Sequence, residues 1–498
     1  MAELDTRPFP PGDYPAVVVG SGPGGLQMSY CLARLGVRHA MLSADPAPGG
    51  MFRRLPLFER LITWSKPHAP AERGTRPYEW YDWNSLLADD PAHRALVPEF
   101  MDGTSYFPSR AEMERGLAAF AERTGIQVRY GCRWEGTRRK SDGFVLLTSD
   151  GEYRCRVAVF AVGAAQPWKP PIPGIESVPH YVEAKPVRAY AGKRVFIIGK
   201  RNSGFEIADA LLPWARQIIL ASPRPVLHSL LSRSTSGVRA RYLQPYEDHV
   251  LAGGILVLDA AIGRIERTPD GYRVFAEGTT ITRALTLSAD EVIAATGFAT
   301  PLLDLPALGV ATVNEGRIPA LTPFWESISG PGIYFAGSAS QGASGLRKHG
   351  IGSNSGGVAG FRHNARVLAA HLAETCFGVR IDRPVLRPDQ VVPYLLAEAT
   401  RAPELWNQQS YLARVVSFNR ERGIVDEGIL PLAHFVDAAG PDAVGMVVET
   451  DREGNHYPVA YVRRSGRVGE HALESDLMLD FETTPHRAQL RALLEGLM

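Results

Sequence analysis

The hydrophobic pattern repeats within the first 300 residues, because two β-branched runs each end in glycine and continue into a helix-like segment. Val17–Gly20 has the pattern of a buried strand, helical spacing follows to about Leu35, and His39–Leu42 has the pattern of a second strand. The same succession returns at Arg194–Gly204 and continues to Leu211. A strand, a glycine turn and a helix open a doubly wound parallel sheet. The pattern therefore predicts two such sheets.

Between the two units, the pattern predicts one more helix and a group of strands. Amphipathic spacing over Arg110–Thr124 predicts the helix, and the runs Gln127–Tyr130, Phe144–Thr148 and Arg156–Phe160 predict strands. The proline-rich stretch Pro167–Gly174 then indicates the exit from the first domain.

After the second unit, the chain is expected to return to the first domain. The apolar runs Glu291–Gly297 and Gly332–Gly337 predict buried strands that end in glycine, and a helix is expected to start at Gly356–Gly357. The strand-like runs Val444–Glu449 and Tyr457–Val462 predict a separate sheet farther along. The chain should then end in a helix over residues 485–497.

These elements predict an α/β fold with two interleaved doubly wound, Rossmann-like domains and an α/β C-terminal extension. The first domain is expected to take residues 1–170 and 291–380, and the second residues 185–290. The extension is expected to take residues 383–498. Residues 53–100 form an irregular stretch rich in tryptophan, tyrosine, proline and arginine. Stretches of this length usually line or cover a site.

The first glycine turn has the G-x-G-x-x-G spacing of a dinucleotide site, with Gly20, Gly22 and Gly25 at the glycine positions. Such turns bring backbone N–H groups and the positive end of a helix dipole to a pyrophosphate. Gly50 supplies a second close approach after the next strand. The position where an acid usually binds the ribose is Ser43, whose hydroxyl can also hydrogen-bond a ribose. The alternative is a glycine turn that only packs helix on strand.

The second glycine turn reads Gly199-Lys200-Arg201-Asn202-Ser203-Gly204, so Arg201 occupies the position of the middle glycine. Its side chain either binds phosphate or blocks the site. Ser222 and Arg224 stand where the ribose is read, and a hydroxyl with a guanidinium suits a 2′-phosphate. NADPH is therefore expected in preference to NADH. The alternative for Arg224 is a solvated loop arginine.

The helix start at Gly356–Gly357 follows a polar glycine loop, and its amides can stabilise negative charge on a reduced flavin. A helix start without a ligand is the alternative reading of this segment.

Charge and composition restrict the classes of partner. The 498 residues carry a formal net charge of +1, with 21% charged residues, which gives no electrostatic basis for nucleic-acid or membrane binding. No apolar run reaches transmembrane length, and the first residues are acidic and polar. We therefore expect a cytoplasmic protein. The sequence does not predict an oligomeric state.

The four cysteines are scattered singly, at Cys31, Cys132, Cys155 and Cys376. Flavoproteins that reduce disulfides relay electrons through a closely spaced cysteine pair, and no C-x-x-C or C-x₄-C spacing is present. We expect structural thiols instead. Metal-ligand spacing of histidine and cysteine is also missing, so no metal is expected.

The chain resembles the class B flavin-dependent monooxygenases and related FAD-dependent oxidoreductase-domain proteins. The segments that carry the resemblance are Val17–Gly25, Gly49–Gly50, Asn202–Gly204, Ala295–Gly297, Tyr334–Gly337 and Gly356–Arg366. The resemblance implies FAD at the first turn, also approached by Gly337 and Ser338, and NADPH at the second. It further implies that reduced flavin and O2 form a C4a-(hydro)peroxide, which delivers one oxygen atom to nitrogen, sulfur or carbon.

Three segments depart from the family pattern. The usual F-x-G-x₃-H signature is reduced to Pro173–His180, and Ser338 replaces an aspartate. The loop that usually places an asparagine at the flavin has Trp64 and Ser65 there. We expect Trp64 to exclude water and Ser65 to donate a hydrogen bond, and name both as catalytic. His180 and His349 could act as acid or base, but ordinary surface or hydrogen-bonded histidines are expected at both positions.

The predicted function is an NADPH-dependent flavin monooxygenase that acts on a small organic substrate with O2. Aromatic residues at positions 64–83 favour an apolar or aromatic substrate. One alternative is an FAD-dependent oxidase or dehydrogenase without a stable peroxide. Another is a flavin-bound protein without catalytic activity.

Overall fold

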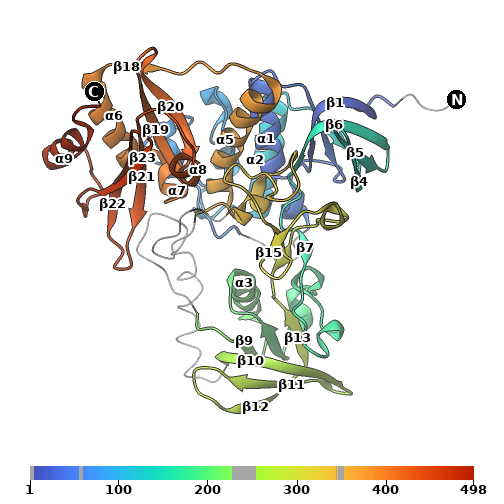
Figure 1. The fold of residues 1–498 in the computed structure, drawn as a ribbon. Helices are drawn as coiled ribbons and strands as arrows, with labels where there is room; N and C mark the ends of the chain where they lie inside the picture. Colours follow the sequence, from blue (N-terminus) through green and yellow to red (C-terminus); the bar gives the residue numbers. More distant parts are fainter. Residues whose placement is uncertain (1–4, 55–59, 227–253, 344, 346–352, 498) are drawn as a thin grey trace.

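The computed structural model describes residues 5–54, 60–226, 254–343, 345 and 353–497. Three sheets dominate the fold, as Figure 1 shows: one built mostly from the N-terminal third, one from the middle of the chain below it, and one from the C-terminal extension on the opposite side. The α/β class and the two doubly wound units that the sequence predicts are confirmed.

The first sheet has the strand order β3-β2-β1-β6-β5-β4, and β17 pairs with β6. Its strands are β1 (Gly12–Val19), β2 (His39–Ser43), β3 (Arg129–Tyr130), β4 (Trp134–Lys140), β5 (Gly143–Thr148), β6 (Gly151–Phe160) and β17 (Ile333–Phe335). The pairings β4–β5 and β5–β6 are antiparallel, and the other pairings are parallel. The nearly continuous apolar runs fit burial on both faces, since Val17 and Val18 are inaccessible to solvent.

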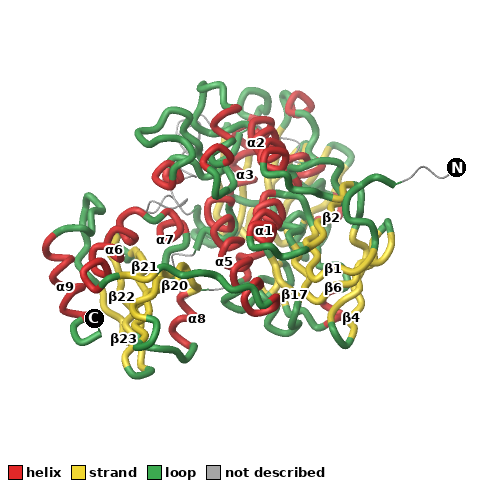
Figure 2. Tube along the Cα trace, turned by 90° about the horizontal axis from the view of Figure 1, so that it is seen from above, coloured by secondary structure: helices red, strands yellow, loops and turns green. Residues whose placement is uncertain are grey.

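Helices α1 (Pro23–Arg34) and α5 (Val358–Phe377) pack side by side against this sheet (Figure 2). Helix α2 (Arg110–Arg123) belongs to the same core and starts in a capping box formed by Ser109 and Glu112. The side chain of Ser109 accepts from the backbone of Glu112, whose carboxylate accepts from the backbone of Ser109. This reciprocal pair defines the helix start.

The second sheet has the order β12-β11-β10-β9-β8-β13. Its strands are β8 (Arg194–Ile198), β9 (Gln217–Ser222), β10 (Ile255–Thr268), β11 (Gly271–Gly278), β12 (Ala284–Ala289) and β13 (Glu291–Ala294). Helix α3 (Asn202–Leu211) packs on one face, and a separate apolar cluster fills the other.

The placement of β13 corrects one expectation. The strand at residue 291 was expected to return the chain to the first sheet, but β13 pairs in parallel with β8 and completes the second. The return to the first sheet comes with β17. A buried apolar strand fits the centre of either sheet equally well, so its composition does not indicate the strand with which it pairs.

The two passages between the domains are bonded to each other. Strand β7 (Gln166–Pro167) leaves the first domain, β14 (Phe298–Ala299) returns from the second, and the two pair antiparallel. Strands β15 (Thr312–Val313) and β16 (Ile318–Pro319) form a small hairpin just beyond them.

The stretch over residues 60–109 is irregular, as the sequence predicts. It holds only the 3₁₀ turns η2 (Arg76–Trp80), η3 (Pro91–His93) and η4 (Val97–Phe100). Other such turns are η1 (Gly50–Arg53), η5 (Ile175–Ser177), η6 (Tyr181–Glu183), η7 (Val187–Tyr190), η9 (Leu305–Leu308) and η10 (Gly337–Gly342).

The extension is built on an antiparallel sheet in the order β18-β20-β19-β21-β22-β23. The elements are β18 (Val385–Leu386), α6 (Pro388–Arg401), α7 (Pro403–Asn407), β19 (Leu412–Asn419), β20 (Gly423–Pro431), α8 (Leu432–Asp437), β21 (Ala443–Thr450), β22 (His456–Arg464), β23 (Arg467–Ala472) and α9 (Thr484–Leu494). Helices α6 and α9 share one core, and α8 lies in another. Among the described residues, no helix combines the length and apolar composition that a bilayer crossing needs.

Candidate functional site

The first glycine turn is fixed by backbone packing at both ends. Gly20 has φ +110°, and a Cβ there would lie 2.5 Å from the carbonyl oxygen of Ala161. A Cβ on Gly25 would lie 1.8 Å from the carbonyl oxygen of Gly20, and one on Gly24 would lie 2.3 Å from the Cα of Gly337. These glycines are therefore required by the fold itself, with or without a ligand.

The middle glycine of the same turn faces open space. A Cβ on Gly22 would meet only the Cα of Gly50, at 3.8 Å. Gly22 is also the N-cap of α1, with no side-chain cap and no acidic residue in the first helical turn. The free N–H groups and the missing Cβ form a cradle that fits a pyrophosphate. The residues present therefore suit the FAD that the sequence predicts here.

The predicted ribose residue, Ser43, is buried and bonded within the protein. Its hydroxyl lies 2.7 Å from that of Ser21 and accepts from the backbone N–H of Asp45 at 3.1 Å. The carboxylate of Asp45 forms an ion pair with Arg54. Ribose binding by Ser43 stays a prediction, and the carboxylate of Asp45 is a second possible hydrogen-bond acceptor at the same strand end.

Two further predicted segments meet the first turn. Gly337 lies against Gly24, and the hydroxyl of Ser338 accepts from the backbone N–H of Ala164 at 3.0 Å. Gly357 caps α5 without a side-chain cap, next to the exposed Gly356. Helix α5 packs on both α1 and η10, so these separate glycine segments gather at one end of the first sheet.

The second turn keeps the same backbone requirements. Gly199 has φ +122°, and its Cβ would lie 2.4 Å from the carbonyl oxygen of Ala295. A Cβ on Gly204 would lie 2.3 Å from the carbonyl oxygen of Gly199. Helix α3 starts at Asn202, followed by Ser203, with no side-chain cap and no acidic residue in its first turn. This helix start also fits a nucleotide phosphate.

Three arginines gather at the second turn. Burial, and then the positive charges of Arg224 and Arg317, lower the pKa of the Arg201 guanidinium. Arg224 follows Ser222, the last residue of β9, and is exposed. A group of mutually repelling cations at a helix start suits a phosphate ligand. Arg317, which stacks on Trp168 at 4.4 Å, lies far from the motif in the sequence, so sequence reasoning missed it.

The predicted catalytic pair lies in a bonded loop. The Ser65 side chain is fully buried, and its hydroxyl donates to Asp82 and accepts from Asn84 at 3.0 Å. Trp64 is partly exposed and stacks on Trp83, with ring centroids 3.8 Å apart. Of the predicted pair, only Trp64 reaches solvent, and both assignments stay predictions. Sequence reasoning missed Asn84, an asparagine that touches the loop from 19 positions along the chain.

The same loop reaches the second domain. Met51 and Ile62 pack against the apolar core beneath the second sheet, although both come from the first domain. Arg362 of α5 fixes the other side of the loop, because its guanidinium donates to the backbone oxygens of Asp82 and Ser85 at 2.9 and 2.8 Å. The loop therefore lies between α5 and the second domain.

The four thiols are free, and none is exposed. Burial raises the pKa of Cys31 to about 11 and that of Cys155 to about 12. Burial also raises the pKa of Cys132, whereas Cys376 is half-buried. Thiols that stay protonated are poor nucleophiles for disulfide exchange.

The two histidines considered as acid or base have different outcomes. His180 is buried, and its Nε2 lies 3.0 Å from the carbonyl oxygen of Gly297 while its Nδ1 accepts from Val182. Burial lowers its pKa. The expected hydrogen-bonded role of His180 is confirmed. His349 lies outside the described residues.

Comparison with known proteins gives matches along most of the chain. A mouse (Mus musculus) FAD-dependent oxidoreductase domain-containing protein 2 is 28% identical over 439 residues, covering 80% of this chain and 64% of the mouse protein. An indole-3-pyruvate monooxygenase of rice (Oryza sativa subsp. japonica) is 27% identical over 207 residues, covering 39% of this chain and 44% of the rice protein.

Among solved structures, a flavin-containing monooxygenase from Stenotrophomonas maltophilia matches the fold with a TM-score of 0.54 at 20% identity. The match covers 73% of this chain and 99% of that structure. The described fold of the first two domains is therefore that of two-domain flavoproteins.

The profile of one family, pyridine nucleotide-disulphide oxidoreductase, matches residues 17–337, which span both glycine turns. Its cofactors are FAD and NADP(H), and the two turns have the geometry that these ligands need. The chain belongs to the pyridine nucleotide-disulphide oxidoreductase family, and it spans less than two thirds of the length of the mouse relative.

Proposed function

We propose that this protein is an NADPH-dependent flavin monooxygenase that transfers one oxygen atom from O2 to a small organic substrate. The observation that carries the proposal is the combination of two nucleotide turns with four free cysteines. NADPH can supply electrons to the flavin, but no thiol pair can pass them on to a disulfide. O2 is then the acceptor that fits. Named monooxygenase activity in the rice relative supports the same class.

This chain's residues would hold the cofactors and shape the space between them. The cradle at Gly22 would bind the FAD pyrophosphate, and Arg201, Arg224 and Arg317 would bind the phosphates of NADPH. When bound, FAD accepts a hydride and reacts with O2. Trp64, in a loop that touches both domains, would exclude water there. The partly exposed aromatic side chains of this loop suit an apolar substrate.

One observation favours a rival function. The Ser65 hydroxyl already donates to Asp82, so it is not free to hold an oxygen adduct. An oxidase or dehydrogenase needs no such donor. In that case, the protein would convert NADPH and O2 into hydrogen peroxide.

The test is the ratio of hydrogen peroxide released to NADPH consumed, with a panel of small aromatic and apolar amines, sulfides and ketones. A monooxygenase should show a ratio well below one with a substrate, together with oxygenated product. A ratio near one with every compound would support the oxidase. Absence of flavin reduction by NADPH would leave only the non-catalytic alternative.

Variants of the loop locate the chemistry. Under the monooxygenase proposal, Trp64→Ala would admit water, and Ser65→Ala would break the bonds with Asp82 and Asn84 that shape the loop. Both variants should keep FAD and NADPH reduction but raise the ratio of peroxide to NADPH by several-fold. Thr137→Ser, in β4 of the first sheet, is a control that should leave the ratio unchanged. Unchanged coupling in both loop variants would show that this loop lies away from the flavin.

A further inference from the structure

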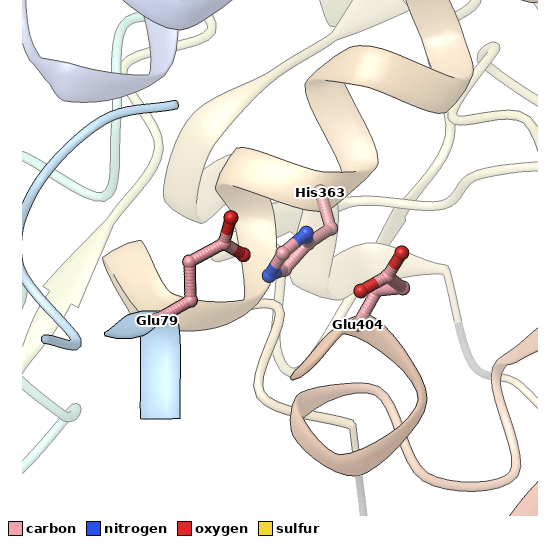
Figure 3. A group of neighbouring side chains, drawn as sticks. All are labelled: Glu79, His363 and Glu404. Carbon is pink, nitrogen blue, oxygen red and sulfur yellow. The ribbon is translucent and has the colours of Figure 1, made fainter. Parts of the chain in front are cut away.

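Three ionisable side chains from distant parts of the chain meet where the extension docks on α5. Glu79 comes from η2, His363 from the second turn of α5, and Glu404 from the first turn of α7. Each offers one ligand atom, and the three atoms lie within 4.8 Å of one another. Figure 3 shows the two carboxylates on either side of the imidazole ring. Neither glycine turn includes any of these residues.

Two atoms of this trio lack the partner that burial normally requires. His363 is 4% exposed and Glu79 is 6% exposed. Nε2 of His363 and Oε1 of Glu79 make no hydrogen bond within the part of the chain that the structure describes. The guanidinium of Arg94 lies 3.8 Å from that Glu79 oxygen, beyond hydrogen-bond distance. Buried polar atoms are rarely left unpaired, so the site is suited to a ligand.

The surroundings keep the imidazole neutral. Burial lowers the pKa of His363 far below its usual range, and four arginines of the same region lower it further. A neutral imidazole has a free lone pair on one ring nitrogen, which is the form that binds metal ions. The Nε2 atom without a hydrogen-bond partner and the approach of the three ligand atoms are the observations that make His363 a candidate metal donor.

The carboxylate of Glu404 is ionised and held in place. Burial raises its pKa, but the charges of Arg76 and Arg414 offset this, and its pKa is lowered overall. Arg76 donates to Oε1 of Glu404 at 2.8 Å and also binds Glu398 through both of its oxygens. Ligating carboxylates are usually fixed by such outer hydrogen bonds.

We propose that Glu79, His363 and Glu404 bind one Zn²⁺ ion, with water as the fourth ligand. One imidazole nitrogen and two carboxylate oxygens match the donors that Zn²⁺ accepts, whereas Mg²⁺ and Ca²⁺ prefer oxygen alone. Ligand atoms about 2.1 Å from a tetrahedral ion lie roughly 3.4 Å apart. The three donors therefore need to approach one another slightly when the ion binds.

A route to the site exists. A cavity of about 680 Å³ between α5 and the extension is lined by His363 and Glu404. Hydrated ions can enter there, and one space remains for the water ligand. Charge within the cavity is mixed, because its arginines are paired with carboxylates such as Glu374 and Glu427. Nε2 of His363 and Oε1 of Glu79, which make no hydrogen bond among the described residues, distinguish the trio from these ion pairs.

The ion would fasten three segments at one interface. Trp80, next to Glu79, contacts Trp406 of the extension with ring centroids 5.6 Å apart, and its indole N–H donates to the backbone of Arg401. Zinc would link η2 and α7 to α5, the helix that packs against α1 at the first glycine turn. Its expected contribution is structural, to the docking of the extension.

The primary experiment uses the full chain with its flavin bound. After dialysis against a chelator, zinc is titrated by calorimetry, and the metal content of the untreated protein is measured by mass spectrometry. We expect one zinc per chain. Loss of an outer hydrogen bond already weakens metal sites 10- to 100-fold, so His363→Gln and Glu404→Gln should each weaken zinc binding on the order of 100-fold or more.

Matched controls are Glu374→Gln and His434→Gln, which line the same cavity outside the trio and should keep wild-type affinity. Chelation should lower the Tm of the wild type but not that of His363→Gln. Equal affinity in wild type and trio variants would overturn the proposal, as would the absence of zinc binding up to about 100 times the protein concentration.

A second measurement needs no variant, in case the trio variants fail to fold. X-ray absorption of the zinc-loaded wild type should show only nitrogen and oxygen neighbours at about 2.0–2.2 Å, including one imidazole. A sulfur neighbour at about 2.3 Å would place the ion at a cysteine and overturn the assignment.

Discussion

The two glycine turns share their outer glycines and differ at the middle position. Gly20 and Gly199 both have positive φ, and Gly25 and Gly204 both lie so close to a carbonyl oxygen that no Cβ fits. Between these fixed points, the first turn has Gly22, open toward solvent, and the second has Arg201.

This difference shows that a glycine in such a turn can be required either by backbone packing or by the close approach of a ligand. The outer glycines are required by backbone contacts that exist without a ligand, so both turns retain them. The middle position has no such close backbone contact in the first turn, so the fold leaves it free to vary with the nucleotide that we propose for each turn. An arginine at this position prevents a phosphate from approaching the backbone closely but offers it a charged contact instead. Arg224 and Arg317 lie near Arg201 and add two more positive charges. A turn that lacks the middle glycine can therefore still suit a nucleotide phosphate.

The largest effect is expected where both turns share a requirement. Gly25→Ala and Gly204→Ala would place a Cβ 1.8 and 2.3 Å from a carbonyl oxygen. Neither oxygen can move without opening the turn, so each variant should lower the free energy of unfolding by about 3 kcal/mol or more. Urea unfolding measures this. Gly12→Ala, whose Cβ would lie 3.9 Å from its nearest atom, is the control. Tolerance of Gly204→Ala would show that the two turns are not held alike.

The next effect concerns the position that differs. Gly22 has φ −72° and ψ 178°, which valine adopts readily, so Gly22→Val should fold. Its side chain would fill the pyrophosphate cradle, and flavin content should fall at least tenfold. The measurement is flavin absorbance per chain. Arg201→Val is the matched change in the second turn and should keep full flavin. Stoichiometric flavin in Gly22→Val would refute the assignment of the first turn to FAD.

A smaller effect is expected from a single phosphate contact. Arg224→Ala should raise the NADPH concentration for half-maximal anaerobic flavin reduction by roughly 10- to 150-fold, corresponding to about 1.5–3 kcal/mol for one charge-assisted bond. NADH, which lacks the 2′-phosphate, should be unaffected. Arg273→Ala, an exposed arginine of β11, is the control. Equal losses with both nucleotides would show that Arg224 does not recognise the 2′-phosphate.

The smallest effect concerns repulsion within the second turn. Arg201 lies near Arg224 and Arg317, whose charges lower its pKa. Arg201→Gln should therefore stabilise the nucleotide-free protein slightly, by less than about 1 kcal/mol, because the site is near solvent. NADPH should then stabilise this variant less than the wild type. Urea unfolding with and without NADPH tests both statements. A variant that is less stable without nucleotide would mean that Arg201 has a structural partner.

Local patterns were sufficient for both glycine turns and for the strands and helices next to them, but not for elements such as β10 (Ile255–Thr268) and β20 (Gly423–Pro431). The apolar runs of β21 and β22 and the strand–glycine–helix units could be predicted because each depends on neighbouring residues. The sheet of β13 could not, because a short apolar strand carries no information about its partner. Its pairing is set by where the chain crosses back between the domains.

Contacts across the irregular stretch were beyond sequence reasoning for a related reason. The bonds of Ser65 with Asp82 and Asn84 depend on how two loop segments fold on each other, and no periodicity describes that. Arg317 and the trio of Glu79, His363 and Glu404 likewise come together only through packing of separate elements. Spacing rules for metal ligands detect ligands on one element and miss those on three.

The pairing of β7 with β14 gives the second domain a single pivot. Two linkers bonded to each other cannot twist independently, so any rotation of that domain bends both around one axis. Trp168 sits on this pivot, since its N–H donates to the backbone oxygen of Gly297 at 3.1 Å, and Arg317 stacks on its ring. Arg317, one of the three arginines at the second turn, is therefore held at the paired linkers. Its distance from Arg201 and Arg224 depends on the angle between the two domains.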